Sequence, residues 1–203
     1  MTIRHQTILP SSPMYQMGRT AQLWYPATQA AYILAATASS AMTVGTALTL
    51  LETYTRGMTS IAFTPGGAPT SAFTFTVIGY DQFGKLQSES VTTGTSANIV
   101  HTVKCYRQLV SITPTAKSST GGDTVSIGWT CVVTSGTPRV ALTFKPTGTG
   151  SIKAMTLALA NGALPTFTAE LVNYTVAVSA NPLLNATVGG YVLCYLDEDD
   201  PNL

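Results

Sequence analysis

The chain has 203 residues, of which only 9% are charged, and its formal net charge is +1. The charged fraction of a typical soluble domain is about 25%, so this poorly charged, Thr-, Ser- and Ala-rich chain predicts a surface that neighbouring subunits cover. The ten Lys and Arg residues are scattered singly, which argues against nucleic acid as a partner because no basic cluster exists to neutralise phosphates. The alternative is a secreted, threonine-rich β domain that its hydroxyl groups keep soluble.

The beginning of the chain predicts an extended arm over residues 1–20, followed by a single domain over residues 21–203. The arm contains prolines, serines and methionines without periodicity, and such arms often become ordered only on a partner. Trp24 and Tyr25 are candidate interface residues, because aromatic side chains are enriched at interfaces. Packing of these two residues within the chain's own core is the equal alternative.

Membrane and secretory readings are not favoured. Residues 20–51 carry no charge, but they are mostly Ala, Thr and Ser and include Pro26 and Gly45, which argues against a membrane-spanning helix. The first residues lack the basic and apolar regions of a signal peptide, so synthesis in a reducing cytoplasm is expected.

The cysteines also favour a reducing cytoplasm. Cys105, Cys131 and Cys194 are odd in number and widely spaced, which favours buried free thiols. One disulfide with one free thiol is the alternative.

The first predicted elements precede a loop rich in glycine and proline. Residues 30–38 have high helix propensity and are left unassigned, whereas alternation over residues 42–50 predicts a strand. A short strand is expected at residues 59–64, ending at the Pro-Gly-Gly-Ala-Pro loop of residues 65–69.

A β-hairpin is predicted over residues 73–93. Phe73, Phe75 and Val77 fall on one face of its first strand, as a period of two requires. The turn is expected in Gly79-Tyr80-Asp81-Gln82-Phe83-Gly84, where the two glycines permit positive φ and Asp81 can bond neighbouring backbone groups.

Further strand signals recur every 10 to 15 residues or so, which is typical of a sandwich or barrel and not of βαβ units. We therefore expect an all-β fold of about ten strands, a jelly-roll-like β-sandwich. A later strand is predicted at residues 99–105, and residues 106–113 either continue it or form the next strand. Further predicted strands cover residues 124–133 with Gly128 as a candidate bulge, 140–144, 152–159, 164–167, 171–178 and 191–196.

Candidate catalytic and metal-binding groups are few. His101 and Cys105 would share one face of a strand but lie roughly 13 Å apart, which disfavours a metal site. No GxSxG motif supports a serine nucleophile. The carboxylate pairs Asp81 with Glu89 and Glu52 with Glu170 have no shared cleft, and the acidic run at residues 197–200 lacks the spacing of a calcium loop. We expect no enzyme activity, cofactor or metal.

Residues 54–129, a little over a third of the chain, contain in order Arg56-Gly57, MTSIAF, FTVIGYDQFGKLQSESVT, YRQLVSIT and DTVSIGWT. This order of features resembles a recurrent domain of tailed-bacteriophage virion proteins, most closely the capsid decoration or cement proteins of the β-sandwich kind. The resemblance is strongest in residues 79–84 with Glu89 beyond them. It implies structural roles, in which Asp81 closes the turn and Glu89 pairs with Arg56 or Lys85.

The resemblance implies a non-enzymatic protein that binds across major capsid subunits and stabilises the phage head. The expected partners are the major capsid protein and further copies of this chain as a dimer or trimer, with no nucleic acid and no membrane. The expected location is the virion, assembled in the bacterial cytoplasm. The alternatives are a tail tube, a head-to-tail adaptor or a fibre base, and a carbohydrate-binding domain that uses Trp24, Tyr80, Tyr106 or Trp129 as an aromatic platform.

Overall fold

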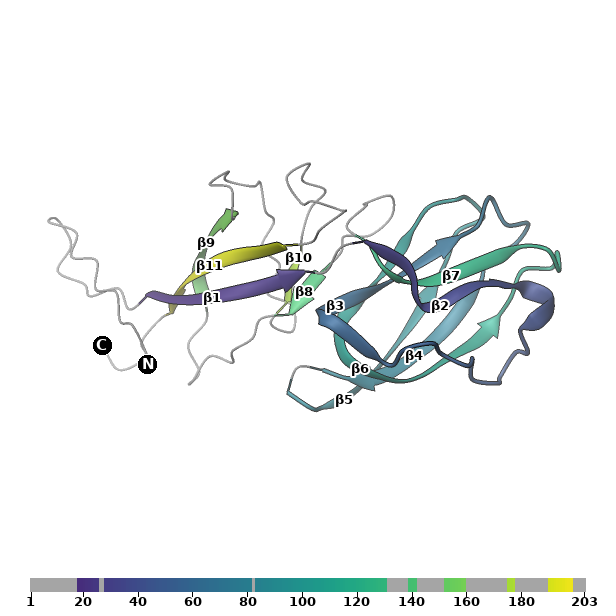
Figure 1. Ribbon diagram of the computed structural model, residues 1–203, viewed down its shortest axis with the longest axis horizontal. Coiled ribbons are helices and arrows are strands. Elements are labelled where there is room, and N and C mark those ends of the chain that lie inside the picture. Colours follow the sequence, from purple (N-terminus) through teal and green to yellow (C-terminus); the bar gives the residue numbers. More distant parts are fainter. Residues whose placement is uncertain are drawn as a thin grey trace, which may run out of the picture.

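The computed structural model describes residues 18–25, 28–81, 83–130, 139–141, 152–159, 175–177 and 190–198, with side chains at 28–55, 59–81 and 83–130 (Figure 1). Its described part is all-β, with a single short 3-10 helix at Ser39–Ala41. The strands are β1 (Gly18–Tyr25), β2 (Gln29–Ala38), β3 (Tyr54–Pro65), β4 (Thr74–Tyr80), β5 (Leu86–Thr92), β6 (Val100–Ala116), β7 (Thr124–Trp129), β8 (Arg139–Ala141), β9 (Ile152–Leu159), β10 (Thr175–Ala177) and β11 (Gly190–Glu198).

All strand pairings in the described residues are antiparallel, and they form two sheets. The larger sheet has the order β10-β8-β3-β6-β4-β5, and β7 joins it by pairing with β3 and β2. The smaller sheet has the order β1-β11-β9 and lies on the left in Figure 1. Because β6 is the central strand between β3 and β4, it sets the relative positions of the side chains on both neighbouring strands.

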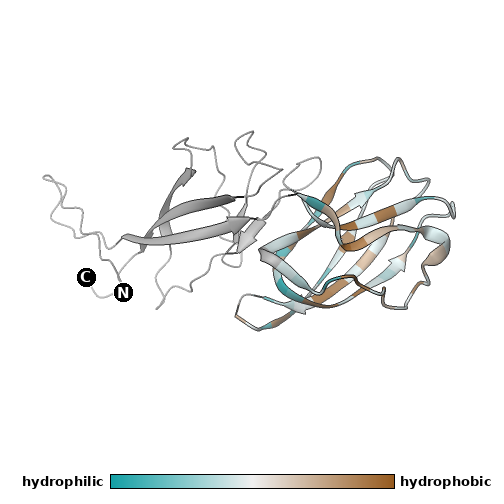
Figure 2. Cartoon of the chain, in the orientation of Figure 1, coloured by the Kyte–Doolittle hydropathy of each residue, from teal (hydrophilic) through white to brown (hydrophobic). Residues whose placement is uncertain are grey.

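The core follows from the alternation of apolar residues in β4. Phe75 and Val77 are fully buried while Thr74, Thr76 and Ile78 are half-buried, which confirms the predicted faces of this strand. Figure 2 shows apolar and polar segments interspersed along the strands of the larger sheet. Phe73 stacks on Phe75 with ring centroids 6.1 Å apart, and Phe63 of β3 stacks on Phe75 at 5.1 Å. Burial of each such ring stabilises the fold by about 2 to 3 kcal/mol. The β4–β5 hairpin is therefore anchored in the core through its first strand.

Two segments differ from the sequence prediction at the start of the larger sheet. Residues 30–38, left unassigned, belong to β2, whereas residues 42–50, predicted as a strand, form none. The segment runs beside the end of β6 through separate hydrogen bonds, from Gly45 N–H to the Pro114 carbonyl at 2.8 Å and from Leu48 N–H to the Ile112 carbonyl at 2.9 Å. Met42 is buried while Val44 is half exposed, so the alternating apolar residues of this segment do not form one buried face.

The predicted strands at residues 99–105 and 106–113 are one strand, β6. Gly18–Tyr25 forms β1, so the last three residues of the expected arm belong to a sheet. Residues 1–17 lie outside the described residues, as do the predicted strand at 164–167 and most of the one at 171–178. The division into an arm and a single domain stays a prediction. No helix in the described part of the chain is long and apolar enough to cross a membrane.

Candidate functional site

The β4–β5 turn lies at residues 81–85, slightly later than the sequence predicts. Asp81 closes it as expected: the Phe83 and Lys85 N–H groups donate to Asp81 Oδ1 at 2.8 and 2.9 Å, and Gly84 N–H donates to the Asp81 carbonyl at 3.1 Å. Gly84 has a φ of +77°, the left-handed conformation that glycine adopts without strain. Gln82 lies outside the described residues. Asp81 thus has a structural role in the turn.

Gly79 does not belong to the turn, and the prediction that it needs a positive φ is wrong. It lies within β4 opposite Leu109 of β6, where the register of the two strands shifts. A Cβ at this position would lie 2.5 Å from the Gln108 carbonyl oxygen and 2.8 Å from Cδ1 of Tyr106. Glycine is required here because β6 approaches the β4 backbone closely.

Glu89 of β5 holds a bulge in β6. Ser60 pairs with Cys105 and Ala62 pairs with His101, so one residue of β3 faces three residues of β6. An irregularity of this kind leaves backbone groups without ladder partners. Within it, Ile61 N–H donates to Thr102 Oγ1 at 2.8 Å, in place of a backbone carbonyl.

The Glu89 carboxylate accepts the two N–H groups that the bulge exposes. Val103 N–H donates to Oε1 at 2.6 Å and Lys104 N–H donates to Oε2 at 2.9 Å, while Lys104 Nζ donates to the Ser88 carbonyl at 2.7 Å. These contacts replace the ion pair with Lys85 that the sequence predicts. The side chain of Arg56, the other expected partner, lies outside the described residues. Glu89 therefore fastens the edge strand β5 to β6.

An exposed apolar row crosses four strands of the larger sheet. Gln108 of β6 lies opposite both Tyr54 of β3 and Tyr80 of β4, and Tyr80 lies opposite Leu86 of β5. Residues directly opposite one another share a face of a sheet. Tyr54 is 58% exposed, Tyr80 38% and Leu86 56%, and Phe83 in the adjoining turn is 45% exposed. We call Tyr54, Gln108, Tyr80 and Leu86, together with Phe83, the aromatic row.

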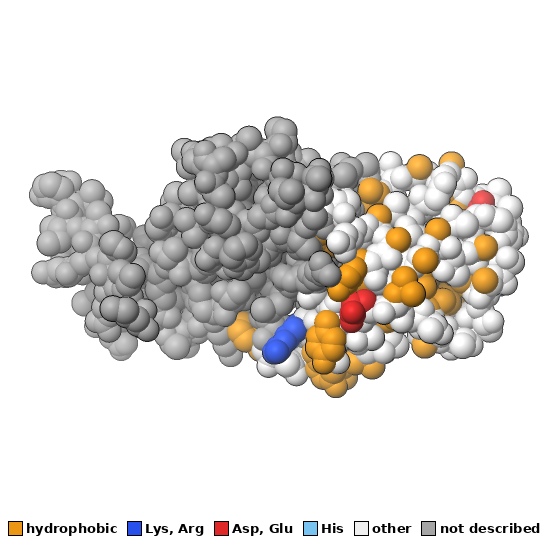
Figure 3. Space-filling model, viewed as in Figure 1, with side chains coloured by type: hydrophobic (Ala, Val, Ile, Leu, Met, Phe, Trp, Pro, Cys, Tyr) orange, Lys and Arg blue, Asp and Glu red, His pale blue; other side chains and the backbone are white. Residues whose placement is uncertain are grey.

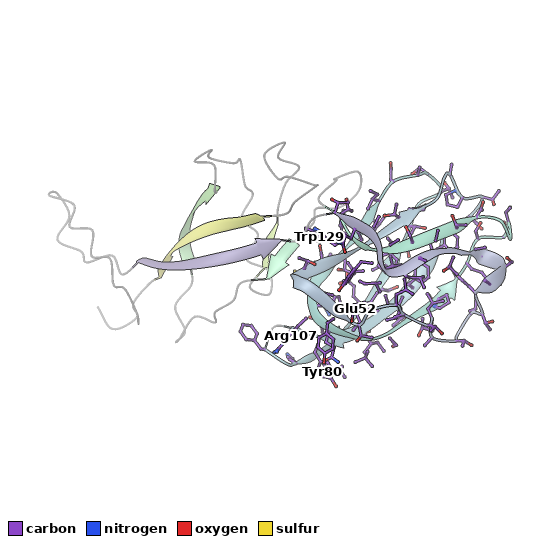
Figure 4. The ribbon with its side chains drawn as sticks, viewed as in Figure 1. Glu52, Tyr80, Arg107 and Trp129 are labelled. Atoms are coloured by element: carbon purple, nitrogen blue, oxygen red, sulfur yellow. The ribbon has the colours of Figure 1, made fainter. Side chains whose placement is uncertain are left out.

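Charged side chains border the aromatic row at two places: Glu52 and Arg107 lie on either side of it, and Asp81 and Lys85 lie in the adjoining turn. Glu52 Oε1 accepts the N–H groups of Thr53 and Tyr54 at 2.9 and 3.2 Å, which holds its carboxylate next to Tyr54. Arg107 precedes Gln108 in β6 and is exposed. Figure 3 shows apolar side chains between a basic and an acidic one on the visible face, and in Figure 4 Tyr80 lies between Arg107 and Glu52. The aromatic row is thus apolar in the middle, with Arg107 and Glu52 on opposite sides of Tyr80 and with Lys85 exposed at its turn end, where the Asp81 carboxylate is bonded to backbone N–H groups.

The aromatic residues proposed for a carbohydrate platform separate into buried and exposed ones. Tyr106 is fully buried and Trp129, at the end of β7, is 5% exposed, so neither presents a ring to a ligand (Figure 4). Tyr80 is exposed, together with Tyr54, which the sequence did not single out. The side chains of Trp24 and Tyr25, the candidate interface residues, lie outside the described residues, although their backbones pair with β11.

The buried polar groups of β6 are tied to the fold. His101 is buried and its Nε2 lies 3.3 Å from the Thr130 carbonyl oxygen, and Cys105 is a buried free thiol. The hydroxyl of Tyr106 has no hydrogen-bond partner in the described structure. Burial raises the pKa of Tyr106, and electrostatic interactions with Glu89 and Cys105 raise it further.

The other polar cluster joins the β3–β4 and β6–β7 loops. Asp123 Oδ2 accepts hydrogen bonds from Ser118 Oγ, from Thr70 Oγ1 at 2.6 Å and from Thr70 N–H at 2.8 Å. The hydrogen bonds from Ser118 and Thr70 lower the pKa of Asp123. A polar cavity of about 90 Å³ lies beside it, lined by residues 66–69 and 122–124. Within the described residues, no group of three or more His, Cys, Asp or Glu side chains is placed to hold a metal ion.

The two candidate carboxylate pairs are not supported as catalytic groups. Asp81 and Glu89 are each engaged by two backbone N–H groups, in the turn and at the bulge respectively. Glu52 borders the aromatic row, and Glu170 lies outside the described residues. Cross-strand register brings the aromatic row together from residues far apart in the sequence, so no local motif could have revealed it.

No family model, curated protein or solved structure matches this chain.

Proposed function

We propose that this chain is a non-enzymatic structural protein of a tailed-phage virion, a capsid decoration or cement protein that binds across major capsid subunits. The observation that carries the proposal is the aromatic row, an apolar surface on a chain with only 9% charged residues. Exposed tyrosines and leucines on a poorly charged protein are typical of a surface that becomes buried in an assembly. The virion is the proposed location because of the resemblance of residues 54–129 to virion domains.

The proposal includes a jelly-roll-like β-sandwich of about ten strands for the domain, which is an ordinary architecture for shell proteins. Antiparallel pairing around the central β6 and a continuous core from β2 to β7 support it. Such a protein stabilises a shell by adding buried interface, repeated by symmetry, and an interface of about 1,200 to 2,000 Å² would be expected for each contact. The partners are the major capsid protein and further copies of this chain.

Purified particles of a phage that encodes this chain test the proposal. Gold-labelled antibody against the chain should decorate the heads evenly, and mass spectrometry should find the chain at a fixed ratio to the major capsid protein. Label confined to tails or to the head–tail joint would favour a tail tube, an adaptor or a fibre base. Absence of the chain from washed particles would overturn the virion assignment.

Carbohydrate binding is the second candidate function, favoured by Tyr54 and Tyr80. Both lie opposite Gln108, on the two strands that flank β6, so their backbones are about 10 Å apart at ordinary strand spacing. Two exposed rings with a polar residue between them can stack on separate sugar rings. A glycan array separates the candidates: specific binding that Tyr54→Ala and Tyr80→Ala abolish would replace the structural proposal, whereas no binding would leave it in place.

A further inference from the structure

We propose that a second copy of this chain covers the aromatic row, in a two-fold arrangement that pairs Arg107 of each copy with Glu52 of the other. The inference rests on the proposed function, since it names the partner of the same surface. It adds which face is used and which symmetry relates the copies.

The middle of the aromatic row provides the apolar part of such a contact. Tyr54, Tyr80 and Leu86 are each more than a third exposed, and their register places them in one line across β3, β4 and β5. A two-fold interface is self-complementary: the same patch is used on both copies. Apolar side chains that lie on the two-fold axis contact the same side chains of the second copy, and the contact excludes water from both apolar surfaces.

The charges at the two sides favour a second copy over a different partner. A two-fold axis through Tyr80 exchanges the two sides of the aromatic row, so Arg107 of one copy faces Glu52 of the other, and the contact occurs twice (Figure 4). A partner that carried a single sign of charge would satisfy one side and repel the other. Opposite charges that meet across an interface fix its register and reject wrong partners.

Both charged groups are available for this contact. Glu52 uses Oε1 for the N–H groups of Thr53 and Tyr54, and within the described part of the chain Oε2 accepts no hydrogen bond. The Arg107 side chain is exposed, and its guanidinium forms neither a hydrogen bond nor an ion pair with any described residue. A carboxylate of the second copy would therefore accept hydrogen bonds from a guanidinium that has no other described partner.

Sedimentation equilibrium of the full chain tests the inference through charge reversal. The wild-type chain should be a dimer at micromolar concentration, and Arg107→Glu should raise the dissociation constant at least tenfold, because it creates two like-charge contacts. Glu52→Lys should have the same effect. An equimolar mixture of the two variants should restore the dimer, since each reversed charge then meets an opposite one. Lys117→Glu makes the same change of charge just past the far end of β6, where Lys117 Nζ donates to the Met42 carbonyl, and should leave the dissociation constant unchanged.

Glu52 also orders its own loop, so folding of every variant is checked by thermal melting. If Glu52→Lys does not fold, Tyr80→Ser replaces it and should also weaken the dimer at least tenfold. A wild-type chain that stays monomeric up to about 100 µM, or a dimer insensitive to Arg107→Glu, overturns the inference. Monomers that still occur on phage heads would leave the proposed function standing, whereas dimers missing from washed particles would contradict that function alone.

Discussion

Gly79 and Gly84 lie on either side of the same hairpin tip, but glycine is needed at each for a different physical reason. Gly84 has a φ of +77°, so an added Cβ would strain the backbone, but it would have no atom within 4 Å. We expect Gly84→Ala to lower the free energy of unfolding by about 1 to 2 kcal/mol. We expect Gly79→Ala to cost about 3 kcal/mol, because its Cβ would overlap the Gln108 carbonyl.

Urea denaturation of both variants measures these costs, with Gly67→Ala as the control. Gly67 has ordinary φ and nothing within 4 Å of an added Cβ, so its substitution should change stability by less than about 0.5 kcal/mol. Asparagine tolerates the left-handed conformation, so Gly84→Asn should recover part of the loss, while Gly79→Asn should not. Equal losses for the two asparagine variants would refute this distinction.

The buried hydroxyl of Tyr106 should reduce stability, because it gives up water on folding and gains no partner. We therefore expect Tyr106→Phe to raise the free energy of unfolding by about 1 kcal/mol. Urea denaturation checks the sign, and Tyr106→Leu serves as a control for the ring, which should be destabilising through lost packing. A clear loss of stability in the phenylalanine variant would mean that the hydroxyl is bonded.

Asp123 should make stability depend on acid pH. Hydrogen bonds from Ser118 and Thr70 lower its pKa in the folded state, so its contribution is fully present above the ordinary Asp value of about 3.9. That contribution is lost as the pH falls from there through the folded pKa. The difference in melting temperature between wild type and Asp123→Asn should be positive at pH 6 and shrink steadily below about pH 4. A difference that stays constant down to pH 2.5 would contradict the linkage.

At the scale of elements, Glu89 joins β5 to the β6 bulge, in addition to the ladder that β5 forms with β4. Glu89→Ala leaves the N–H groups of Val103 and Lys104 without acceptors, and we expect a loss of about 2 kcal/mol. Glu89→Gln retains an acceptor and should lose about half as much. Ser90→Ala, an exposed neighbour in β5, is the control and should be nearly neutral. Faster amide exchange of Val103 and Lys104 in Glu89→Ala alone would locate the effect at the bulge.

The sequence predicted those elements whose conformation depends on residues close together in the chain. The β4 faces and the Asp81 turn followed from residues adjacent in the chain, since both depend on local geometry. Residues 42–50 alternate as well, but they pack beside the end of β6 without forming a ladder, so alternation alone was misleading. Propensity also left residues 30–38 unassigned, because pairing with β7 decides their conformation.

The candidate site could not be predicted because it depends on register between distant strands. Gln108 lies opposite Tyr54 because the register of β3 and β6 shifts between Tyr54 and Thr59. It lies opposite Tyr80 because the register of β4 and β6 shifts between Ile78 and Gly79. The Glu89 contact depends on another bulge, at residues 102–104. Irregularities of this kind carry little local signal, whereas a shift by one residue would turn the exposed side chains to the other face.

At the scale of the whole molecule, the low charge and the aromatic row give one account: an assembly subunit with a surface made for burial. With a net charge of +1, little electrostatic repulsion opposes close packing of copies. The row also lies on paired strands of the larger sheet, from β3 through β6 and β4 to the edge strand β5, which Glu89 bonds to β6. Assembly through a preordered surface loses less conformational entropy than assembly through a flexible loop.

Hydroxyl-radical footprinting of Tyr54 and Tyr80 tests this account most directly, by comparing washed phage particles with the isolated chain at a concentration where it is monomeric. Val110, an exposed side chain of β6 outside the aromatic row, serves as the internal reference. The account predicts that both tyrosines are labelled several times more slowly in the particle than in the monomer. Equal labelling of the tyrosines in the two states, or no peptide of this chain in the particles, would contradict it.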